Sequence, residues 1–182
     1  MAVLETARLT LRPFSPKDLD PMARLMANVD FMRFSLGVYS REQTAAFIEK
    51  LLGWQRANKP SLFAVILRSD ETETGDSGPL LGYCGFYHQH IDGIDEIEIG
   101  YRIDPDFWNK GIATEAARAV RHHAFGDLKL ARVISLISPE NHPSRRVAEK
   151  MGMTLEKLTI YRELPTQVFS LAREKWARTN DA

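Results

Sequence analysis

The sequence predicts a mixed α/β domain, and two observations support this fold class. Segments with the period-two alternation or continuous apolar character of strands are interleaved with segments whose apolar residues recur at helical spacing. In chain order they read β-α-α-β-β-β-α-β-α-β-β, which lacks the regular alternation of a doubly wound fold. The chain has 182 residues, enough to bury one core, and shows no repeat or dividing linker, so we expect a single domain over residues 1–182.

The first part of the chain is expected to form a strand and two helices. Apolar and polar residues alternate over Arg8–Phe14, which indicates a strand. Ser15, followed by Pro16, has the pattern of a helix start. A second helix is expected over Arg41–Ala57, because Ser40 begins a capping-box pattern in front of it.

Three strands are expected in the middle of the chain. They cover Leu62–Leu67, Leu80–His88 and Ile94–Ile103, which are rich in β-branched, aromatic and other apolar residues. The segment Arg68–Pro79 is rich in Gly, Asp and Ser and has few apolar residues. It is therefore expected to be an exposed connection between two of these strands.

A third helix is expected to begin near Ala113, with an apolar face at helical spacing, and to end where Gly126 takes a left-handed conformation. The remaining expected elements are a strand over Arg132–Ser138, a short helix over Pro143–Met151 stopped by Gly152, and strands over Thr154–Ile160 and Val168–Glu174.

Composition and charge narrow the class of function. The chain has 24 Lys and Arg and 24 Asp and Glu residues, and a net charge of zero argues against bulk attraction to nucleic acid or membrane. No apolar run approaches the roughly 20 residues of a transmembrane helix, and no export signal is visible, so a cytoplasmic enzyme is expected. Cys84 is the single cysteine; it cannot form an intramolecular disulfide, and a packed thiol is expected.

The segment Glu96–Gly126 carries the strongest functional signal. It reads as a strand, a short glycine-containing loop over Trp108–Thr114, and a helix. The first N–H groups of a helix have no intrahelical partner, and the helix dipole favours negative charge there, so this loop suits a phosphate or pyrophosphate. It lacks both G-x-x-x-x-G-K-[ST] and G-x-G-x-x-G, which counts against an NTPase or a dinucleotide enzyme.

Four stretches carry a family resemblance: LETARLTLRP at residues 4–13, EIGYRIDP at 98–105, FWNKGIATEA at 107–116 and NHPSRRVAEKMGM at 141–153. In their order and spacing they resemble the GNAT superfamily of acyl-coenzyme A-dependent N-acyltransferases. More narrowly, the chain resembles the RimJ/RimL-like branch, whose namesakes acetylate N-termini of ribosomal proteins. Asn109 stands where the wider pattern has glycine, and asparagine tolerates unusual backbone angles better than most residues.

The resemblance implies a GNAT fold and a cosubstrate. The fold has a central, mostly antiparallel twisted sheet flanked by helices, with the fourth and fifth strands splayed apart and the pantetheine arm of acetyl-coenzyme A in the gap. The side chain of Asn141 either bonds this arm or caps a helix, and both roles are compatible; Lys110 either adds charge to the site or is solvated. The residues implied in cofactor binding are Tyr101, Arg102, Ile103, Asn109, Lys110, Gly111, Ile112, Ala113, Thr114 and Asn141.

The implied reaction is direct transfer of an acetyl group to a primary amine, without a covalent enzyme intermediate. Glu98 is the candidate base, and strand alternation places it on one face with Glu96 and Arg102; the alternative is a solvated or ion-paired carboxylate. Ser144 is the candidate donor of a proton to the leaving thiolate; the alternative is a helix-cap partner.

The acceptor site is expected to involve Phe31, Phe34, Tyr83 and His88, although such aromatic residues are more often part of a core. No histidine spacing resembles a zinc motif, so no metal is expected. The acceptor is either a protein N-terminus or a small-molecule amine. A noncatalytic acyl-coenzyme A sensor or scaffold is the alternative function, and a homodimer through the last strand is an open alternative to a monomer.

Overall fold

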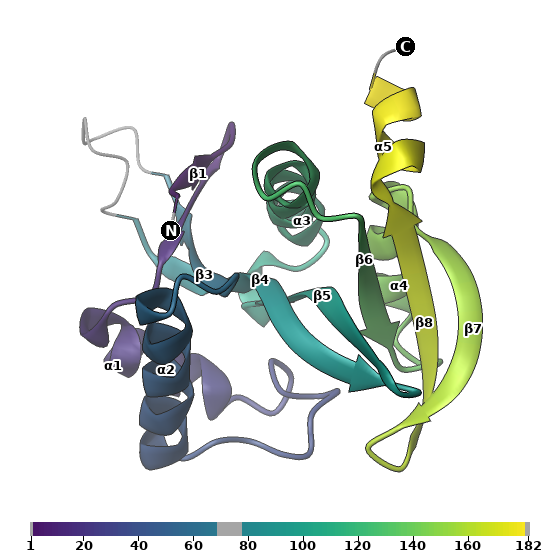
Figure 1. Ribbon diagram of the computed structural model, residues 1–182. Helices are drawn as coiled ribbons and strands as arrows, with labels where there is room; N and C mark the ends of the chain where they lie inside the picture. Colours follow the sequence, from purple (N-terminus) through teal and green to yellow (C-terminus); the bar gives the residue numbers. More distant parts are fainter. Residues whose placement is uncertain (1, 69–77, 181–182) are drawn as a thin grey trace.

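The computed structural model describes residues 2–68 and 78–180, which build an eight-stranded sheet in the order β1-β2-β3-β4-β5-β6-β8-β7 (Figure 1). Neighbouring strands pair antiparallel except β5 and β6, which are parallel. The strands are β1 (Leu4–Glu5), β2 (Leu9–Pro13), β3 (Leu62–Leu67), β4 (Leu80–Ile91), β5 (Ile94–Ile103), β6 (Arg132–Ile137), β7 (Thr154–Tyr161) and β8 (Leu164–Ala172).

Helices cover both faces of this sheet, and short helical turns flank them. The helices are α1 (Leu19–Met26), α2 (Arg41–Arg56), α3 (Ile112–His122), α4 (His142–Lys150) and α5 (Arg173–Asn180). The turns are Pro16–Asp18, Pro105–Phe107 and the π turn His123–Asp127. This arrangement confirms the predicted mixed α/β class and the mostly antiparallel sheet.

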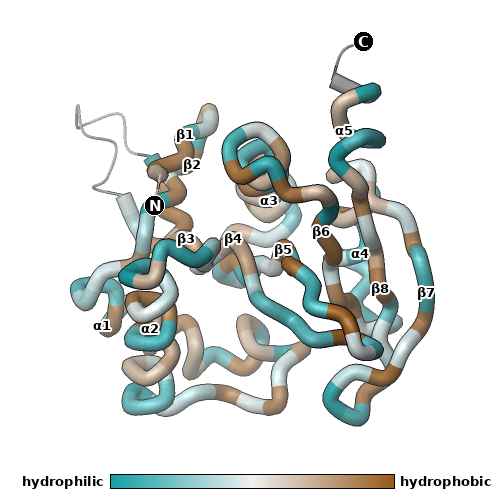
Figure 2. The backbone as a smooth tube through the Cα atoms, viewed as in Figure 1, coloured by the Kyte–Doolittle hydropathy of each residue, from teal (hydrophilic) through white to brown (hydrophobic). Residues whose placement is uncertain are grey.

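The side chains of β3 point alternately to the two faces of the sheet, and each set belongs to a different hydrophobic core. Leu62, Ala64 and Ile66 pack with α1 and α2 on one face, while Phe63 and Val65 pack with α3 on the other. Successive strand residues point to opposite faces, so an entirely apolar strand serves two hydrophobic layers. In Figure 2 the helices α1 and α2 alternate between hydrophilic and hydrophobic residues along the chain, as one-sided packing requires.

The β5–β6 pair is the feature that positions the site. It registers at one position, where Glu98 lies opposite Ile134. Figure 1 shows β1–β4 on one side of this pair and β8 and β7 on the other. The structure has one strand more than the sequence predicts, the short β1 at the beginning. The predicted fourth and fifth strands are therefore β5 and β6, and these are the two strands that separate.

Local signals predicted several elements well. Ser40 and Gln43 form the expected capping box: the Ser40 side chain accepts from the Gln43 N–H, and the Gln43 side chain accepts from the Ser40 N–H at 2.8 Å. Gly152, with φ 86°, follows α4 as expected. Cys84 is fully buried in β4, and burial raises the pKa of its thiol, which agrees with the expected packed cysteine.

Two boundary predictions were wrong. Gly126 does not take a left-handed conformation; it lies in the π turn, which the Leu128 N–H closes on the His123 carbonyl, and Lys129 takes the positive φ of 54°. The last strand does not reach Glu174, because β8 ends at Ala172 and α5 begins at Arg173. Of the expected connection Arg68–Pro79, residues 69–77 lie outside the described part of the chain.

Candidate active site

A cleft of about 800 Å³ opens where β5 and β6 separate. It is bounded by the α1–α2 connection, α2, β4, β5, the β6–α4 loop and the β7–β8 turn. The predicted site residues that line it are Phe34, Tyr83, His88, Glu98, Tyr101, Arg102, Asn141 and Ser144. Residues from distant parts of the sequence therefore meet in one cavity at the separation of the two strands.

Glu98 has a defined hydrogen-bond environment at the centre of this cleft. Its side chain is buried, its Oε1 accepts from the Leu136 N–H at 3.3 Å, and its Oε2 accepts from the Gln89 amide. The Tyr161 hydroxyl in turn donates to the Gln89 Oε1 at 2.6 Å and fixes that amide. Burial raises the pKa of the Glu98 carboxyl, because the charged form loses its hydration. A carboxyl with a raised pKa in a cleft is suited to accepting a proton near neutral pH.

The strand alternation around Glu98 agrees with the prediction. Ile97, Ile99 and Tyr101 belong to the core layer that contains α3. Glu96 lies on the opposite face, and its carboxylate is 3.0 Å from the Arg132 guanidinium. The ion pairing that the sequence predicts as an alternative for Glu98 is thus made by Glu96.

Ser144 and Asn141 lie at the start of α4, on the other side of the gap from β4. The Asn141 Oδ1 accepts from the Ser144 N–H at 3.2 Å, so Asn141 is a helix cap while it also lines the cleft. The Ser144 carbonyl accepts from the Tyr101 hydroxyl at 3.0 Å. Tyr101 therefore ties β5 to the first turn of α4, a side-chain role that the sequence did not indicate.

The predicted phosphate loop has two left-handed residues. Asn109 has φ 60° and Gly111 has φ 78°, and Gly111 is the N-cap of α3. The Glu115 N–H donates to the Gly111 carbonyl at 3.0 Å and starts the helical ladder. The preceding N–H groups, those of Ile112, Ala113 and Thr114, are the first of the helix and are directed out of its N-terminus.

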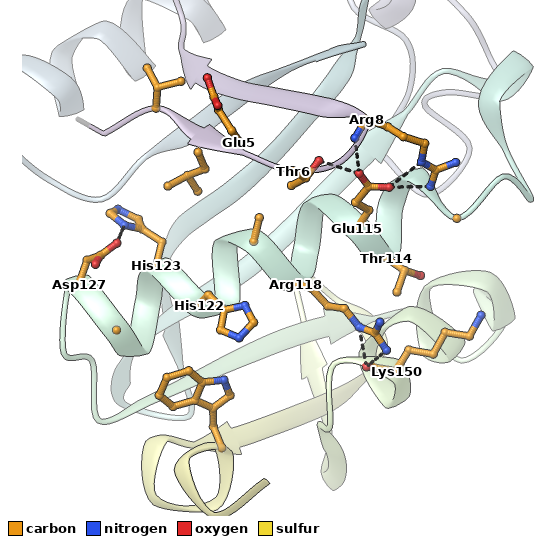
Figure 3. Close-up of a pocket in the computed structure, with 16 residues that line it drawn as sticks. Glu5, Thr6, Arg8, Thr114, Glu115, Arg118, His122, His123, Asp127 and Lys150 are labelled. Atoms are coloured by element: carbon orange, nitrogen blue, oxygen red, sulfur yellow. Dashed lines mark hydrogen bonds and ion pairs between the residues drawn. The ribbon is translucent and has the colours of Figure 1, made fainter. Parts of the chain in front are cut away.

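Arg8 and Glu115 hold this loop in place (Figure 3). The Arg8 Nη1 donates to the Lys110 carbonyl at 2.9 Å, and its Nη2 lies 2.6 Å from the Glu115 carboxylate. Glu115 also accepts from the Thr6 hydroxyl and the Arg8 N–H. The backbone of the loop is thus fixed by the β1–β2 connection, which precedes it by about a hundred residues.

The Lys110 ammonium is turned back onto its own loop. Its Nζ donates to the Asp106 carbonyl at 2.9 Å and lies 5.0 Å from the Phe107 ring centroid. Trp108 is similarly occupied, because its indole N–H donates to the Ile103 carbonyl at 2.7 Å. The predicted anion site of the loop therefore depends on its backbone N–H groups more than on Lys110.

Not all predicted site residues line the cleft. Phe31 is buried behind its wall, where its carbonyl accepts from the Arg102 guanidinium at 2.8 Å. Ile103 ends β5 and the loop 109–114 comes after it, and neither lines the cleft. Gly111 and Thr114 line a second hollow between β1, α3 and α5 (Figure 3). In that hollow, polar side chains pair with their neighbours, as in the His123–Asp127 contact at 2.7 Å.

Sequence reasoning missed part of the cleft wall. Phe47 and Trp54 line it, although their helical spacing is equally consistent with an ordinary core stripe. Gln89 and Tyr161 were not anticipated, and no local motif marks them. Periodicity shows which face of a helix is apolar, but it does not distinguish a core from the wall of a cavity.

Within residues 2–68 and 78–180, no group of three or more His, Cys, Asp and Glu side chains is arranged to hold a metal ion. In the same part of the chain, no helix combines the length and apolar character needed to cross a membrane.

Comparisons with known proteins agree with one another. The family model described as an acetyltransferase (GNAT) domain matches residues 8–154. The chain is 33% identical to the uncharacterized N-acetyltransferase YnaD of Bacillus subtilis, over 84% of this chain and 83% of that protein. The crystal structure of a GNAT-family acetyltransferase from Bacillus anthracis is 29% identical, with a TM-score of 0.76, and the match covers 95% of this chain and 99% of that one. The structure of RimL, a ribosomal L7/L12 α-N-protein acetyltransferase in complex with coenzyme A, has a TM-score of 0.76 over 96% of this chain and 99% of that chain; at 18% identity, this similarity concerns the fold.

Proposed function

The chain belongs to the GNAT acetyltransferase family and is an acetyl-coenzyme A-dependent N-acetyltransferase, and from this premise we propose that it transfers acetyl directly to a primary amine within the β5–β6 cleft. The acceptor is a protein N-terminus or a small-molecule amine. The observation that carries the proposal is the meeting of Glu98 and Ser144, from β5 and α4, in the same cavity.

The residues present suit acetyl-coenzyme A. The pyrophosphate is assigned to the N–H groups of Ile112, Ala113 and Thr114, where the helix dipole favours negative charge. The pantetheine arm is assigned to the cleft, where the backbone of Tyr101 and Arg102 and the amide of Asn141 offer hydrogen-bonding groups. When bound, acetyl-coenzyme A supplies a thioester whose acetyl carbon is open to attack by an amine. The coenzyme A in the similar RimL structure supports this assignment.

Glu98 is assigned the role of general base. An amine is mostly protonated at neutral pH and attacks only in its neutral form, so a carboxylate that removes its proton, directly or through one water, increases the reactive fraction. The hydrogen bonds from Gln89 and the Leu136 N–H orient the carboxylate, and its raised pKa strengthens it as a proton acceptor.

Ser144 is assigned the role of proton donor to the leaving thiolate. It lies in the first turn of α4, where it lines the cleft and its backbone carbonyl accepts from the Tyr101 hydroxyl. A positioned side chain that donates a proton as the C–S bond breaks neutralises the charge that develops on the sulfur. Cys84 is fully buried in the opposite layer and takes no part in this scheme.

Calorimetric titration of acetyl-coenzyme A into wild type, Thr114→Glu and Thr114→Gln tests the cofactor assignment. Thr114 lies in the first turn of α3, where a carboxylate is favourable to the helix but repels a pyrophosphate. We expect micromolar binding by wild type, similar binding by Thr114→Gln, and at least about tenfold weaker binding by Thr114→Glu with its thermal stability maintained. Equal affinity of all three proteins would place the pyrophosphate elsewhere, and no binding by folded wild type would contradict the proposal.

A further inference from the structure

We infer that the acceptor is a primary amine carried on an aromatic or otherwise apolar body that has no second positive charge. The inference rests on the proposed function, because it concerns the acceptor part of the same cleft. The amine belongs either to a free arylalkylamine or to the aromatic first residue of a peptide, since both present the same ring and amine.

An aromatic wall forms one side of the acceptor part. The rings of Phe47 and Tyr83 lie 5.7 Å apart between centroids, Tyr83 and Tyr87 lie 6.5 Å apart, and Trp54 and His88 lie 5.0 Å apart. All five side chains line the cleft, from α2 and β4. Aromatic rings prefer other rings edge-on or offset at such distances, so this wall favours a flat apolar ligand.

The α1–α2 connection extends this apolar lining. Phe34 and Leu36 line the cleft with 41% and 80% of their surface exposed. Met32, in the same connection, is buried and belongs to the core cluster shared with α1 and α2. The Arg102 guanidinium fixes the connection by donating to the carbonyls of Phe31 and Phe34 at 2.8 and 3.4 Å. Large apolar side chains held exposed at the mouth of a cavity are suited to covering an apolar ligand.

The charges of the cleft oppose a polycationic acceptor. Among the described residues that line it, the cationic side chains are Lys50, Arg102 and Arg162, and the acidic ones are Glu98 and Glu140. Glu140 lies in the β6–α4 loop beside the assigned pantetheine site, which leaves Glu98 as the carboxylate near the aromatic wall. Lys50 has its ammonium 4.9 Å from the Trp54 ring centroid, so a cation of the protein already occupies one aromatic face.

The same cations assist the reaction. Arg102 and Arg162 are close enough to Glu98 to act on its carboxyl electrostatically, secondary to the effect of burial. An ammonium placed beside Glu98 therefore has two guanidinium groups nearby, and like charges lower the pKa of an amine. A singly charged acceptor would lose its proton and become the nucleophile, whereas a second, distant ammonium would remain charged and be repelled.

The size of the cleft limits the acceptor further. Its volume of about 800 Å³ is shared between the assigned pantetheine arm and the acceptor. Since pockets for small ligands commonly have about 300–1,000 Å³ in total, the shared space fits one ring system with a short amine-bearing arm.

Steady-state acetylation of tryptamine, of a tripeptide that begins with phenylalanine, and of spermidine at saturating acetyl-coenzyme A tests the inference. We expect kcat/KM for the better aromatic substrate to exceed that for spermidine by about a hundredfold, because ring contacts favour the first and charge repulsion opposes the second. The ranking of tryptamine against the tripeptide identifies the source of the aromatic amine.

Lys50→Glu provides the sharper comparison, with Lys59→Glu as its matched control. Both lysines are exposed and lie on or just after α2, but only Lys50 lines the cleft. Lys50→Glu should reduce the preference for the aromatic amine over spermidine about tenfold, because the repelling charge becomes attractive. Lys59→Glu should leave the preference unchanged.

The outcomes separate the inference from the function on which it rests. If spermidine is acetylated as well as the aromatic amines, or better, the inference is overturned while the acetyltransferase function stands. Transfer to neither aromatic substrate also overturns it, and simultaneous failure to bind acetyl-coenzyme A in calorimetry would contradict the proposed function as well. Equal effects of Lys50→Glu and Lys59→Glu would contradict the role given to the charge of Lys50.

Discussion

The hydroxyl of Tyr101 donates a hydrogen bond to the backbone carbonyl of Ser144, with the two oxygens 3.0 Å apart. The bond joins the C-terminal part of β5 to the first turn of α4 across the region where β5 and β6 part. It is made to a backbone atom, so it is independent of the serine side chain. The position of Ser144 and the chemistry of its hydroxyl can therefore be changed separately.

Tyr101→Phe removes this bond while keeping the ring in the core. We expect the free energy of unfolding to fall by about 0.5–1.5 kcal/mol, the usual contribution of one such bond. We also expect a lower kcat, because the start of α4 loses its attachment to β5. Urea denaturation and steady-state kinetics measure the two effects; unchanged stability would show that the bond is not formed in solution.

Ser144→Ala keeps the backbone acceptor and removes the hydroxyl. Stability should stay within about 0.5 kcal/mol of wild type, since the Tyr101 bond survives and the site is partly exposed. If the hydroxyl donates a proton to the thiolate, kcat should fall by about a hundredfold. Full activity of this variant would assign Ser144 a capping role alone.

Glu98→Gln tests the general base through pH dependence. The rate of wild type should rise as pH increases through the raised pKa of Glu98, because the base acts only when deprotonated, and the variant should lose this limb together with about 10²–10⁴ in kcat. A variant that retained the same limb and most of the rate would exclude Glu98 as the base.

The same variant has a predicted effect on stability. Since the folded pKa of Glu98 lies above its ordinary value of 4.5, its contribution to stability is complete below pH 4.5 and is lost as pH rises through the folded pKa. Glu98→Gln should therefore gain stability relative to wild type with increasing pH. Denaturant titrations at pH 4.5 and pH 8 compare the two proteins.

Gly111→Ala tests the left-handed loop, with Gly126→Ala as its control. At φ 78° an alanine at position 111 should cost about 1–2 kcal/mol, and its Cβ would meet the Arg8 guanidinium at 3.4 Å. The strain should also weaken acetyl-coenzyme A binding by displacing the N–H groups of the helix start. Gly126 has open space around it and no positive φ, so alanine there should be neutral or stabilising. Thermal denaturation and calorimetry compare both variants, and equal effects would contradict this account.

Glu115→Gln tests the clamp on the loop under acid. Burial alone would raise the pKa of Glu115, but the hydrogen bonds and charge from Thr6 and Arg8 outweigh it and hold the pKa below its ordinary value of 4.5. Its contribution to stability is present above pH 4.5 and is lost as pH falls through the folded pKa. The variant should therefore be less stable than wild type at pH 7, and the difference should shrink toward pH 3 in denaturant titrations. Glu149→Gln, which alters an exposed pair with Arg145 within one helix, should show a smaller change.

Elements with strong local signals were predicted well from the sequence. The bounds of β3 match because it is an apolar run of strand length, and those of β5 match because apolar and polar residues alternate along it. Helix α2 begins where the Ser40 capping box indicates. The errors arise where contacts with residues distant in the sequence determine the local structure. Residues Gln89–Ile91 extend β4 because they pair with β5, and Gly126 remains in a helical turn in which Ala124 and Phe125 are buried. The turn before β8 depends on positive φ at Arg162 and Glu163, which their residue types do not suggest.

In the site, too, local residue types predict some features, and tertiary contacts determine the others. The left-handed conformations of Asn109 and Gly111 agree with the residue types at those positions. The partners of Glu98 could not be predicted, because Tyr161 reaches Gln89 from 72 positions away and only tertiary structure brings them together. The Arg8 contact with the Lys110 carbonyl spans 102 positions and has the same origin.

The buried position of Cys84 has a practical consequence for the laboratory. It is the single cysteine of the chain, it has no exposed surface, and burial disfavours its thiolate form, which is the form that reacts with disulfide reagents. A chromogenic disulfide added to the native enzyme should therefore develop colour in proportion to the free coenzyme released. The protein itself contributes almost no background, so turnover of any candidate amine can be recorded continuously without removing or labelling a residue.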